Sequence, residues 1–381
     1  MKRIGIILVV CILLTMLPVS ASAAPEVAGK SALLMDMQTG KVLYEKNAHE
    51  KLAPASVTKV MTMLLIMEAI DSGTIGWEDT VTTSDAAAAK GGSQDYLKVG
   101  ETMTVTDMLK SIAVSSANDC ACAMAEHLAG SEAAFVERMN ARAKELGMND
   151  THFVNCTGLD DSEEAKNHRT SAHDIAVMSR QLLKNHPDIK KFTTIWMDSV
   201  RGGAFGLSNT NKMIRFYDGA TGLKTGFTSG AGYCLSASAL RDGMELIAGV
   251  MGAESSQVRF QSCKAMLDHG FASYALIQPD LCEAGDVPVT LGKAISVQPR
   301  MGESATVLID KSQRSSVTTD IQLEQSLPAP VSQGQRIGTM TVKSGEQILK
   351  EIPLVAAEGV ERLTYGDIFL QVLRRAAMAR L

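Results

Sequence analysis

The hydrophobic positions of the chain change their period several times, and each change predicts a different element. Residues 30–37 and 41–46 are short apolar runs on either side of the turn Gln-Thr-Gly at 38–40, which predicts a β-hairpin. Between residues 57 and 70 the apolar positions become helical in spacing and lie on almost every side. A helix with so little polar surface is predicted to lie in the centre of its domain.

Helical spacing returns in the next part of the chain. Over residues 104–146 Thr106 or Asp107 is the expected N-cap, and the pair Gly-Ser at 130–131 divides the segment into two helices. Residues 171–183 are predicted to form a further helix.

Beyond residue 205 the pattern is extended. Residues 219–227, 232–239 and 244–251 are three short apolar runs separated by turn residues, which predicts an antiparallel meander, and residues 257–274 follow as a helix. Together with the preceding helices, this predicts an α/β (α+β) domain in which helices cover an antiparallel sheet.

The last hundred or so residues differ in composition. Residues 278–359 consist of short runs of Val, Ile and Thr between Gly and Pro, as expected for a separate small all-β domain. In residues 360–381 the apolar side chains, including Ile368, Phe369 and Val372, share one helical face, while arginines such as Arg374 lie elsewhere. Such a basic amphipathic helix either lies in a membrane surface or packs on its own domain.

The N-terminus has the features of a secretory signal. Lys2 and Arg3 precede an apolar run at 4–17, and Ala-Ser-Ala at 21–23 offers a small-x-small cleavage pattern. The alternative is an uncleaved membrane anchor, but the run is shorter than the ~20 residues that span a bilayer. We therefore predict a signal peptide at 1–23, a main domain at 24–277, a β domain at 278–359 and an amphipathic helix at 360–381.

Composition narrows the possible functions. The 381 residues are 45% hydrophobic and 21% charged, which excludes a disordered chain, a collagen and a multispan membrane protein. With 37 Lys and Arg against 42 Asp and Glu, the net charge of −5 gives no reason to expect a nucleic-acid partner. Of seven cysteines, Cys11 lies in the signal, and the remaining six are either disulfide-bonded or small buried hydrophobes. No Cys or His spacing fits a zinc site, so we expect neither a metal nor a cofactor.

Residues 56–59 (SVTK) place a serine and a lysine one helical turn apart at the start of the apolar helix. The alternative is a helix N-terminus with a lysine that reaches the surface. However, this helix has little polar face, and it carries the single SxxK of the chain. A buried lysine with a lowered pKa can be neutral and accept the proton of the serine hydroxyl. Ser56 and Lys59 are therefore the candidate nucleophile and base.

Two further motifs follow in the order expected for such a site. Residues 116–118 (SAN) supply a second hydroxyl and an amide, although a polar turn between helices is the simpler interpretation of that motif alone. Residues 224–226 (KTG) end a predicted strand; residues 343–345 (KSG) have similar chemistry but lie at a predicted hairpin turn with no nucleophile nearby. A serine nucleophile, a second hydroxyl next to an amide, and a lysine on a strand together form the set described for penicillin-binding proteins and serine β-lactamases.

Four segments resemble the D-alanyl-D-alanine carboxypeptidases among the low-molecular-mass penicillin-binding proteins. They are residues 54–59 (PASVTK), 114–119 (VSSAND), 153–155 (FVN) with the following Gly-Leu at 158–159, and 218–233 (DGATGLKTGFTSGAGY). The similarity extends over roughly residues 25–365. It implies a β-lactamase/transpeptidase-like domain, a β domain and a C-terminal amphipathic anchor. It also implies a protein exported to the outer face of the cytoplasmic membrane, which removes the terminal D-Ala from peptidoglycan stem pentapeptides and is acylated by β-lactam antibiotics.

The resemblance implies a role for each motif residue. Ser56 would attack the D-Ala-D-Ala carbonyl with Lys59 as general base, and Ser116 would relay the proton to the leaving amine. Substrate would be held by Asn118 and by the strand residues Lys224, Thr225, Gly226 and Phe227, with the main-chain N–H groups of Ser56 and Phe227 as an oxyanion hole and Arg259 as the partner of the terminal carboxylate. For Arg259 the alternative is an ordinary arginine on a helix surface.

Two positions depart from the commoner family pattern. Ala117 replaces a glycine, which would narrow the freedom of the backbone there. Phe227 stands where His or Tyr is frequent, which leaves substrate preference and pH profile open.

The same motifs also fit other functions on this scaffold. A β-lactamase would add a glutamate in an E-x-x-L-N motif; the nearest string, residues 163–167 (EEAKN), has Lys in place of Leu. An endopeptidase or transpeptidase shares the acyl-enzyme and differs in its acceptor. A module that binds penicillin without turnover is the alternative from a different class.

Overall fold

The structure is a computed structural model that describes residues 24–281 and 284–378. The predicted signal peptide, Cys11 and Cys282 lie outside the described residues. The chain divides into two compact units, Met1–Ser273 and Tyr274–Leu381, which we describe separately.

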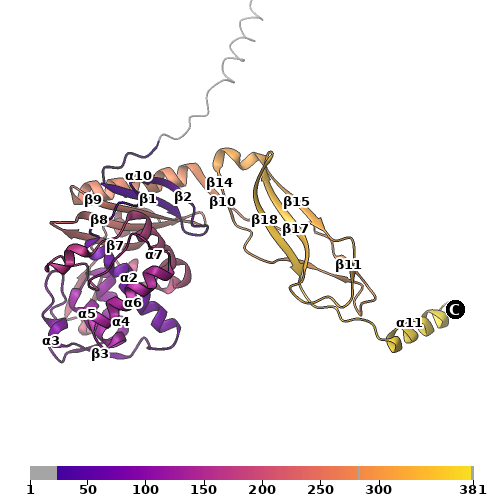
Figure 1. Cartoon of the computed structure of the whole chain (residues 1–381), viewed down its shortest axis with the longest axis horizontal. Helices are drawn as coiled ribbons and strands as arrows, with labels where there is room; N and C mark the ends of the chain where they lie inside the picture. Colours follow the sequence, from indigo (N-terminus) through magenta and orange to yellow (C-terminus); the bar gives the residue numbers. More distant parts are fainter. Residues whose placement is uncertain (1–23, 282–283, 379–381) are drawn as a thin grey trace, which may run out of the picture. The chain divides into compact units, whose positions relative to one another are not determined.

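The first unit is built on a five-stranded antiparallel sheet (Figure 1). Its strand order is β2-β1-β9-β8-β7, where β1 is Ser31–Asp36, β2 Val42–Lys46, β7 Ala220–Thr228, β8 Gly232–Arg241 and β9 Met244–Ala253. The predicted hairpin is β1–β2 and the predicted meander is β7–β8–β9, so both predictions are confirmed. Strand β7 forms one edge of the sheet.

Helices pack on both faces of this sheet. On one face Gly249 of β9 approaches α7 (Ala172–Asn185), and on the other face Leu246 of β9 approaches Gly270 of α10 (Ser256–Ser273). Beyond α7 lies a helical cluster formed by α2 (Lys59–Asp71), α4 (Val105–Val114), α5 (Asn118–Ala129) and α6 (Glu132–Glu145). Helix α2 is buried along most of its length, as its all-round apolar pattern predicted.

The region predicted to contain two helices contains three. The predicted break at residues 130–131 is present, but α4 also ends at Val114 and α5 begins at Asn118. The physical reason is Ser116, whose φ of +68° is left-handed and cannot continue a helix. The N-cap of α4 is Thr104, whose hydroxyl accepts the N–H of Asp107 at 3.1 Å, and the prediction of Thr106 or Asp107 was therefore wrong.

Shorter elements connect these parts of the first unit. They are η1 (Ala55–Thr58), β3 (Thr80–Thr82), α3 (Asp85–Ala88), β4 (Thr102–Thr104), η2 (Glu164–Asn167), η3 (Pro187–Ile189), α8 (Lys190–Thr193), β5 (Met197–Val200), η4 (Arg201–Gly203), β6 (Phe205–Ser208) and α9 (Met213–Phe216).

The second unit is built mainly of short strands. A four-stranded sheet joins β13 (Pro299–Met301), β18 (Gln347–Ala356), β17 (Arg336–Ser344) and β15 (Val317–Leu323); a three-stranded sheet joins β12 (Ser296–Val297), β11 (Val287–Thr290) and β16 (Leu327–Pro328); β10 (Tyr274–Ile277) pairs with β14 (Val307–Asp310), which η5 (Lys311–Ser316) follows. Because β10 pairs within this unit, its residues belong with the β strands, whereas the sequence-based boundary after residue 277 assigned them to the first domain.

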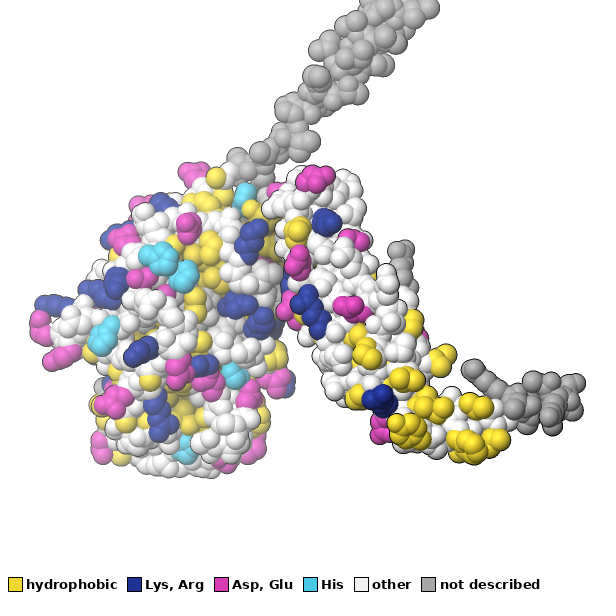
Figure 2. Space-filling model, turned by 45° about the vertical axis from the view of Figure 1, so that its right-hand side comes forward, with side chains coloured by type: hydrophobic (Ala, Val, Ile, Leu, Met, Phe, Trp, Pro, Cys, Tyr) yellow, Lys and Arg dark blue, Asp and Glu magenta, His cyan; other side chains and the backbone are white. Residues whose placement is uncertain are grey.

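The C-terminal helix α11 spans Tyr365–Met378. It is shorter than the predicted segment 360–381, because Val360 is buried and bridges to Val331, and Arg362 bridges to Gly292. Apolar side chains gather along α11 in Figure 2; the exposed ones include Phe369, Leu370, Val372 and Leu373. Among the described residues, no helix is both long enough and apolar enough to span a bilayer.

The cysteines of the described segments are all buried and free: Cys120, Cys122, Cys156, Cys234 and Cys263. They occupy the core as small hydrophobes, which is one of the two states that the sequence allowed.

Candidate active site

Ser56 and Lys59 meet at the start of the central helix. Ser56 lies in the 3₁₀ turn η1, and Lys59 is the first residue of α2, so the two side chains share one face. Lys59 Nζ lies 3.1 Å from Ser56 Oγ and donates a hydrogen bond to the carbonyl oxygen of Thr157 at 2.9 Å. The side chain of Lys59 is fully buried, so the alternative of a lysine that reaches the surface is wrong.

Burial favours the neutral form of this amine. It lowers the pKa of Lys59 from 10.5 to about 7, so that near neutral pH a large fraction of the amine is unprotonated. A neutral amine within hydrogen-bonding distance of a hydroxyl can remove its proton as the oxygen attacks.

Ser116 and Asn118 lie at the junction of α4 and α5, where the left-handed backbone of Ser116 turns the chain. Asn118 Nδ2 donates to the carbonyl oxygen of Gly91 at 2.7 Å. The hydroxyl of Ser116 and Oδ1 of Asn118 are buried and have no hydrogen-bond partner among the residues that the structure describes. Buried polar atoms without a partner are rare, and at a catalytic centre they point to a ligand or substrate group that would satisfy them.

Gly226 allows the edge strand β7 to approach Ser56 closely. A Cβ at this position would lie 2.6 Å from the carbonyl oxygen of Pro54 and 3.0 Å from the main-chain nitrogen of Ser56. Any other residue would therefore push the strand away from Ser56.

Lys224 and Thr225 precede that glycine on β7. The Lys224 amine is buried and donates to the carbonyl oxygen of Thr225 at 3.0 Å, and the Thr225 hydroxyl donates to that of Thr210 at 2.6 Å. Burial, and then the charges of Lys59 and Arg259, hold the pKa of Lys224 well below its usual range. Lys59, Lys224 and Arg259 are thus electrostatically coupled within one site.

Arg259 is buried, with 7% of its surface exposed, so it is not an ordinary surface arginine. Its Nη1 donates to the carbonyl oxygens of Gly226 at 2.9 Å and Cys234 at 3.3 Å. These contacts hold the guanidinium against the main chain of β7 and β8, and its Nε has no partner in the described part of the chain.

The two departures from the common pattern are explained by geometry. Ala117 has a φ of −56°, which any residue adopts, so glycine is not required there. Phe227 is 53% exposed, and its ring packs against that of Tyr233 with 4.3 Å between centroids. Its side chain therefore faces solvent at the rim of the site, while its main chain remains part of β7.

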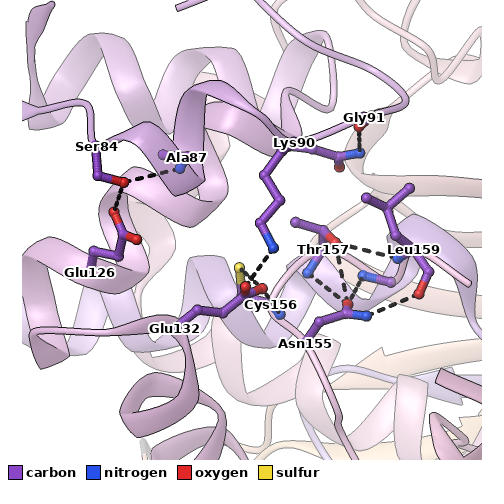
Figure 3. Close-up of polar contacts among 12 residues, drawn as sticks. Ser84, Ala87, Lys90, Gly91, Glu126, Glu132, Asn155, Cys156, Thr157 and Leu159 are labelled. Atoms are coloured by element: carbon purple, nitrogen blue, oxygen red, sulfur yellow. Dashed lines mark hydrogen bonds and ion pairs between the residues drawn. The ribbon is translucent and has the colours of Figure 1, made fainter. Parts of the chain in front are cut away.

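The loop that holds Lys59 is organised by a residue that the sequence did not single out for a role. The Asn155 side chain accepts the N–H groups of Thr157 at 3.2 Å and Gly158 at 2.6 Å, and donates to the carbonyl oxygen of Leu159 at 2.9 Å (Figure 3). This fixes the carbonyl that accepts from Lys59. Asn155 belongs to a segment that carries the family resemblance, and that was the available signal.

An ion pair links the loop of Asn155 to the loop of Gly91, whose carbonyl oxygen accepts from Asn118. Lys90 Nζ lies 2.5 Å from Glu132 Oε2, and Glu132 Oε1 accepts the main-chain N–H of Cys156 at 3.2 Å (Figure 3). Lys90 directly precedes Gly91, the acceptor of the Asn118 amide. No local pattern marks Lys90 or Glu132, because their partners are distant in the sequence.

Two other motifs that the sequence offered have simpler structural surroundings. Glu163, the nearest equivalent of a β-lactamase glutamate, is exposed and paired with Lys166 at 2.5 Å. Residues 343–345 lie at the hairpin between β17 and β18, where Gly345 has a φ of +57°.

Known proteins with similar sequences are peptidases of one type. The sequence model of a family described as D-alanyl-D-alanine carboxypeptidase matches residues 18–255, and that of the penicillin-binding protein 5 C-terminal domain matches residues 279–362. The D-alanyl-D-alanine carboxypeptidase DacF of Bacillus subtilis is 44% identical over 87% of this chain and 86% of its own. DacC of Escherichia coli is 34% identical over 89% of this chain and 86% of its own.

Solved structures agree with this relationship. Penicillin-binding protein 5 of Haemophilus influenzae superimposes with a TM-score of 0.76 at 28% identity, covering 90% of this chain and 100% of that one. Penicillin-binding protein D2 of Listeria monocytogenes, in its ampicillin-bound form, gives a TM-score of 0.56 at 31% identity, covering 64% of this chain and 98% of that one. The chain therefore belongs to the D-alanyl-D-alanine carboxypeptidase family and is a hydrolase of that type.

Proposed function

We propose that this protein removes the terminal D-alanine from peptidoglycan stem pentapeptides through an acyl-enzyme on Ser56. The observation that carries the proposal is the fully buried Lys59 amine, which lies 3.1 Å from Ser56 Oγ and has a pKa lowered to about 7. In the first step, neutral Lys59 takes the hydroxyl proton as Ser56 Oγ attacks the carbonyl carbon of the D-Ala-D-Ala bond.

The negative oxygen formed by this attack is stabilised by two main-chain donors, the N–H groups of Ser56 and Phe227. The contact between Gly226 and Ser56 supports this assignment, because it brings β7 against the nucleophile. A donor of this kind is worth about 3 kcal/mol in the transition state.

Ser116 passes the proton on to the nitrogen of the leaving D-alanine. Its buried hydroxyl has no partner in residues 24–281 and 284–378, so it is available to the reacting groups. The C–N bond then breaks, D-alanine leaves as the free amino acid, and the rest of the peptide remains as an ester of Ser56. A water molecule, deprotonated by the same base, hydrolyses the ester and restores the enzyme.

The substrate lies along the edge strand β7. Asn118 Oδ1 accepts an N–H group of the peptide, and Lys224, Thr225 and the buried Arg259 provide the positive, hydrogen-bonding surface for its terminal carboxylate. The lowered pKa of Lys224 supports this assignment, because a carboxylate bound there would offset the burial and the repulsion from Lys59 and Arg259 that disfavour its charge. A β-lactam carries a strained amide and a carboxylate in a similar arrangement, so we propose that it acylates Ser56 in the same way.

We also propose that the mature protein acts at the outer face of the cytoplasmic membrane. The N-terminal pattern supports export, and the exposed apolar side chains of α11 support docking on a membrane surface.

The test is D-alanine release from a peptide ending in Lys-D-Ala-D-Ala, with the signal-free protein and its Ser56→Ala variant side by side. Release that requires Ser56 is the expected result. A folded protein that releases no D-alanine would refute the carboxypeptidase and favour an endopeptidase or transpeptidase; penicillin turnover would then separate a β-lactamase from a module that binds without turnover.

A further inference from the structure

We propose that His168 is a positioning residue for the nucleophile and acts through the hydroxyl of Thr58; this proposal rests on the function proposed above. His168 is buried, and its Nε2 lies 2.8 Å from Thr58 Oγ1. The Thr58 hydroxyl in turn donates to the carbonyl oxygen of Ala55 at 2.9 Å. The chain of hydrogen bonds therefore ends on the residue directly before Ser56.

Ala55 has a backbone that must be held in place. Its φ of +48° is left-handed, a conformation that residues with a side chain rarely adopt and that persists only when neighbouring contacts enforce it. Gly158 packs against the same carbonyl so closely that a Cβ there would lie 1.9 Å from the Ala55 oxygen. Thr58 supplies the hydroxyl that fixes this carbonyl from within η1.

The direction of every hydrogen bond in the chain is determined. The main-chain N–H of Val154 donates to His168 Nδ1 at 3.1 Å, so the neutral ring carries its proton on Nε2. That proton goes to Thr58 Oγ1, and the single proton of Thr58 goes to Ala55. Each donor and each acceptor is used once, which leaves one orientation for both side chains.

The imidazole stays neutral at neutral pH. Burial, followed by the nearby His152 and Arg169, lowers the pKa of His168 to about 3. The ring of Phe153 packs edge-on against it, with 5.6 Å between centroids. A protonated ring would turn Nδ1 into a donor facing the N–H of Val154, so protonation would break the chain at its first link.

This chain of hydrogen bonds orients one of the proposed oxyanion donors. A trans peptide group is planar, and its C=O and N–H point in opposite directions. Fixing the carbonyl of Ala55 therefore also fixes the direction of the Ser56 N–H, which is one of the two proposed donors. His168 makes no contact with the substrate in this account; it sets the peptide plane from which that donor projects.

The test uses four single variants and one double variant. It measures acylation by benzylpenicillin and separates the dissociation constant of the first complex from the acylation rate constant. Thr58→Val, which removes the hydroxyl at nearly constant shape, should lower the rate constant roughly 10- to 100-fold, since misaiming one donor costs less than the ~10²- to 10³-fold of losing it. Thr58→Ser should stay within about threefold of the wild type, because it keeps the hydroxyl. His168→Met should lower the rate constant, and His168→Gln, which keeps a donor near Nε2, should recover part of the loss.

The double variant Thr58→Val/His168→Met distinguishes positioning from general destabilisation. Because the chain is linear, the double variant should acylate no more slowly than Thr58→Val alone, with the dissociation constant unchanged throughout. Three results would overturn the proposal. The rate losses of the two single variants could multiply in the double variant, or the dissociation constant could rise while the rate constant is unchanged. The third is a Thr58→Val protein that is acylated as fast as the wild type. If Thr58→Val does not fold, His168→Gln against His168→Met decides, and equal rates in these two overturn it. A wild-type protein that is not acylated at all would refute the proposed function instead.

Discussion

Replacing Lys59 by methionine should abolish acylation and at the same time stabilise the protein. The lowering of the Lys59 pKa from 10.5 to about 7 corresponds to roughly 5 kcal/mol by which the folded protein disfavours the charged amine. Methionine fills a similar volume without that cost. It leaves the carbonyl oxygen of Thr157 without its donor, a loss of about 1–3 kcal/mol. The expected net gain near pH 7 is therefore about 2 kcal/mol.

The stability difference between Lys59→Met and the wild type should depend on pH, and this dependence is the specific test. Below pH 7 both the folded and the unfolded chain hold the proton, and the folded chain bears the full cost of the buried charge. Between about 7 and 10.5 the unfolded chain binds more protons at this site, so the wild type gains stability as the pH rises. The advantage of Lys59→Met should therefore shrink between pH 7 and pH 9 by about 2–3 kcal/mol.

Urea unfolding of the first unit at several pH values, followed by circular dichroism, measures this difference. Lys41→Met is the matched control, because Lys41 is exposed and its replacement should give no comparable change with pH. A Lys59→Met protein that is less stable than the wild type at pH 7, with a difference that does not change with pH, would refute the claim that the folded protein disfavours the charged form of Lys59.

Three further outcomes follow from the contacts. Gly226→Ala should lower penicillin acylation at least about 100-fold, because its Cβ would meet the backbone of Pro54 at 2.6 Å; a near-normal rate would contradict the tight approach of β7. Phe227→Ala should change acylation by less than about threefold, since the proposed donor is main chain and the side chain is exposed; a loss as large as that expected for Gly226→Ala would assign the ring a direct role. Truncation after Thr364 removes α11 and keeps the strands of the second unit, and it should release the protein from anionic vesicles in a sedimentation assay. Phe369→Glu should have the same effect in the full chain. Binding that persists in both variants would exclude α11 as the anchor.

Features set by local periodicity could be predicted from the sequence. The hairpin, the meander and the buried helix α2 each follow from spacing alone, and the serine–lysine pair was recognisable because that helix has almost no polar face. The break at Ser116 was missed, because the flanking residues are helical in pattern and a left-handed serine has no sequence signature. The C-terminal helix begins later than predicted, because Val360 is apolar at helical spacing but is buried in the second unit, where it bridges to Val331.

The supporting residues of the site could not be predicted, for a different reason. His168 contacts the hydroxyl of Thr58 and Glu132 accepts the main-chain N–H of Cys156, and both partners are distant in the sequence, so these contacts depend on the tertiary fold. Arg259 was recognised by family resemblance, and its burial against β7 depends on how α10 packs over the sheet.

The most direct test of the account is the position of the covalent adduct formed with benzylpenicillin, mapped by mass spectrometry of proteolytic peptides from the signal-free protein. The account predicts a single adduct on Ser56, formed faster as the pH rises through about 7 and absent from Ser56→Ala. An adduct on another residue, or one that persists in Ser56→Ala, would contradict the assignment of Ser56 as the nucleophile activated by a neutral Lys59.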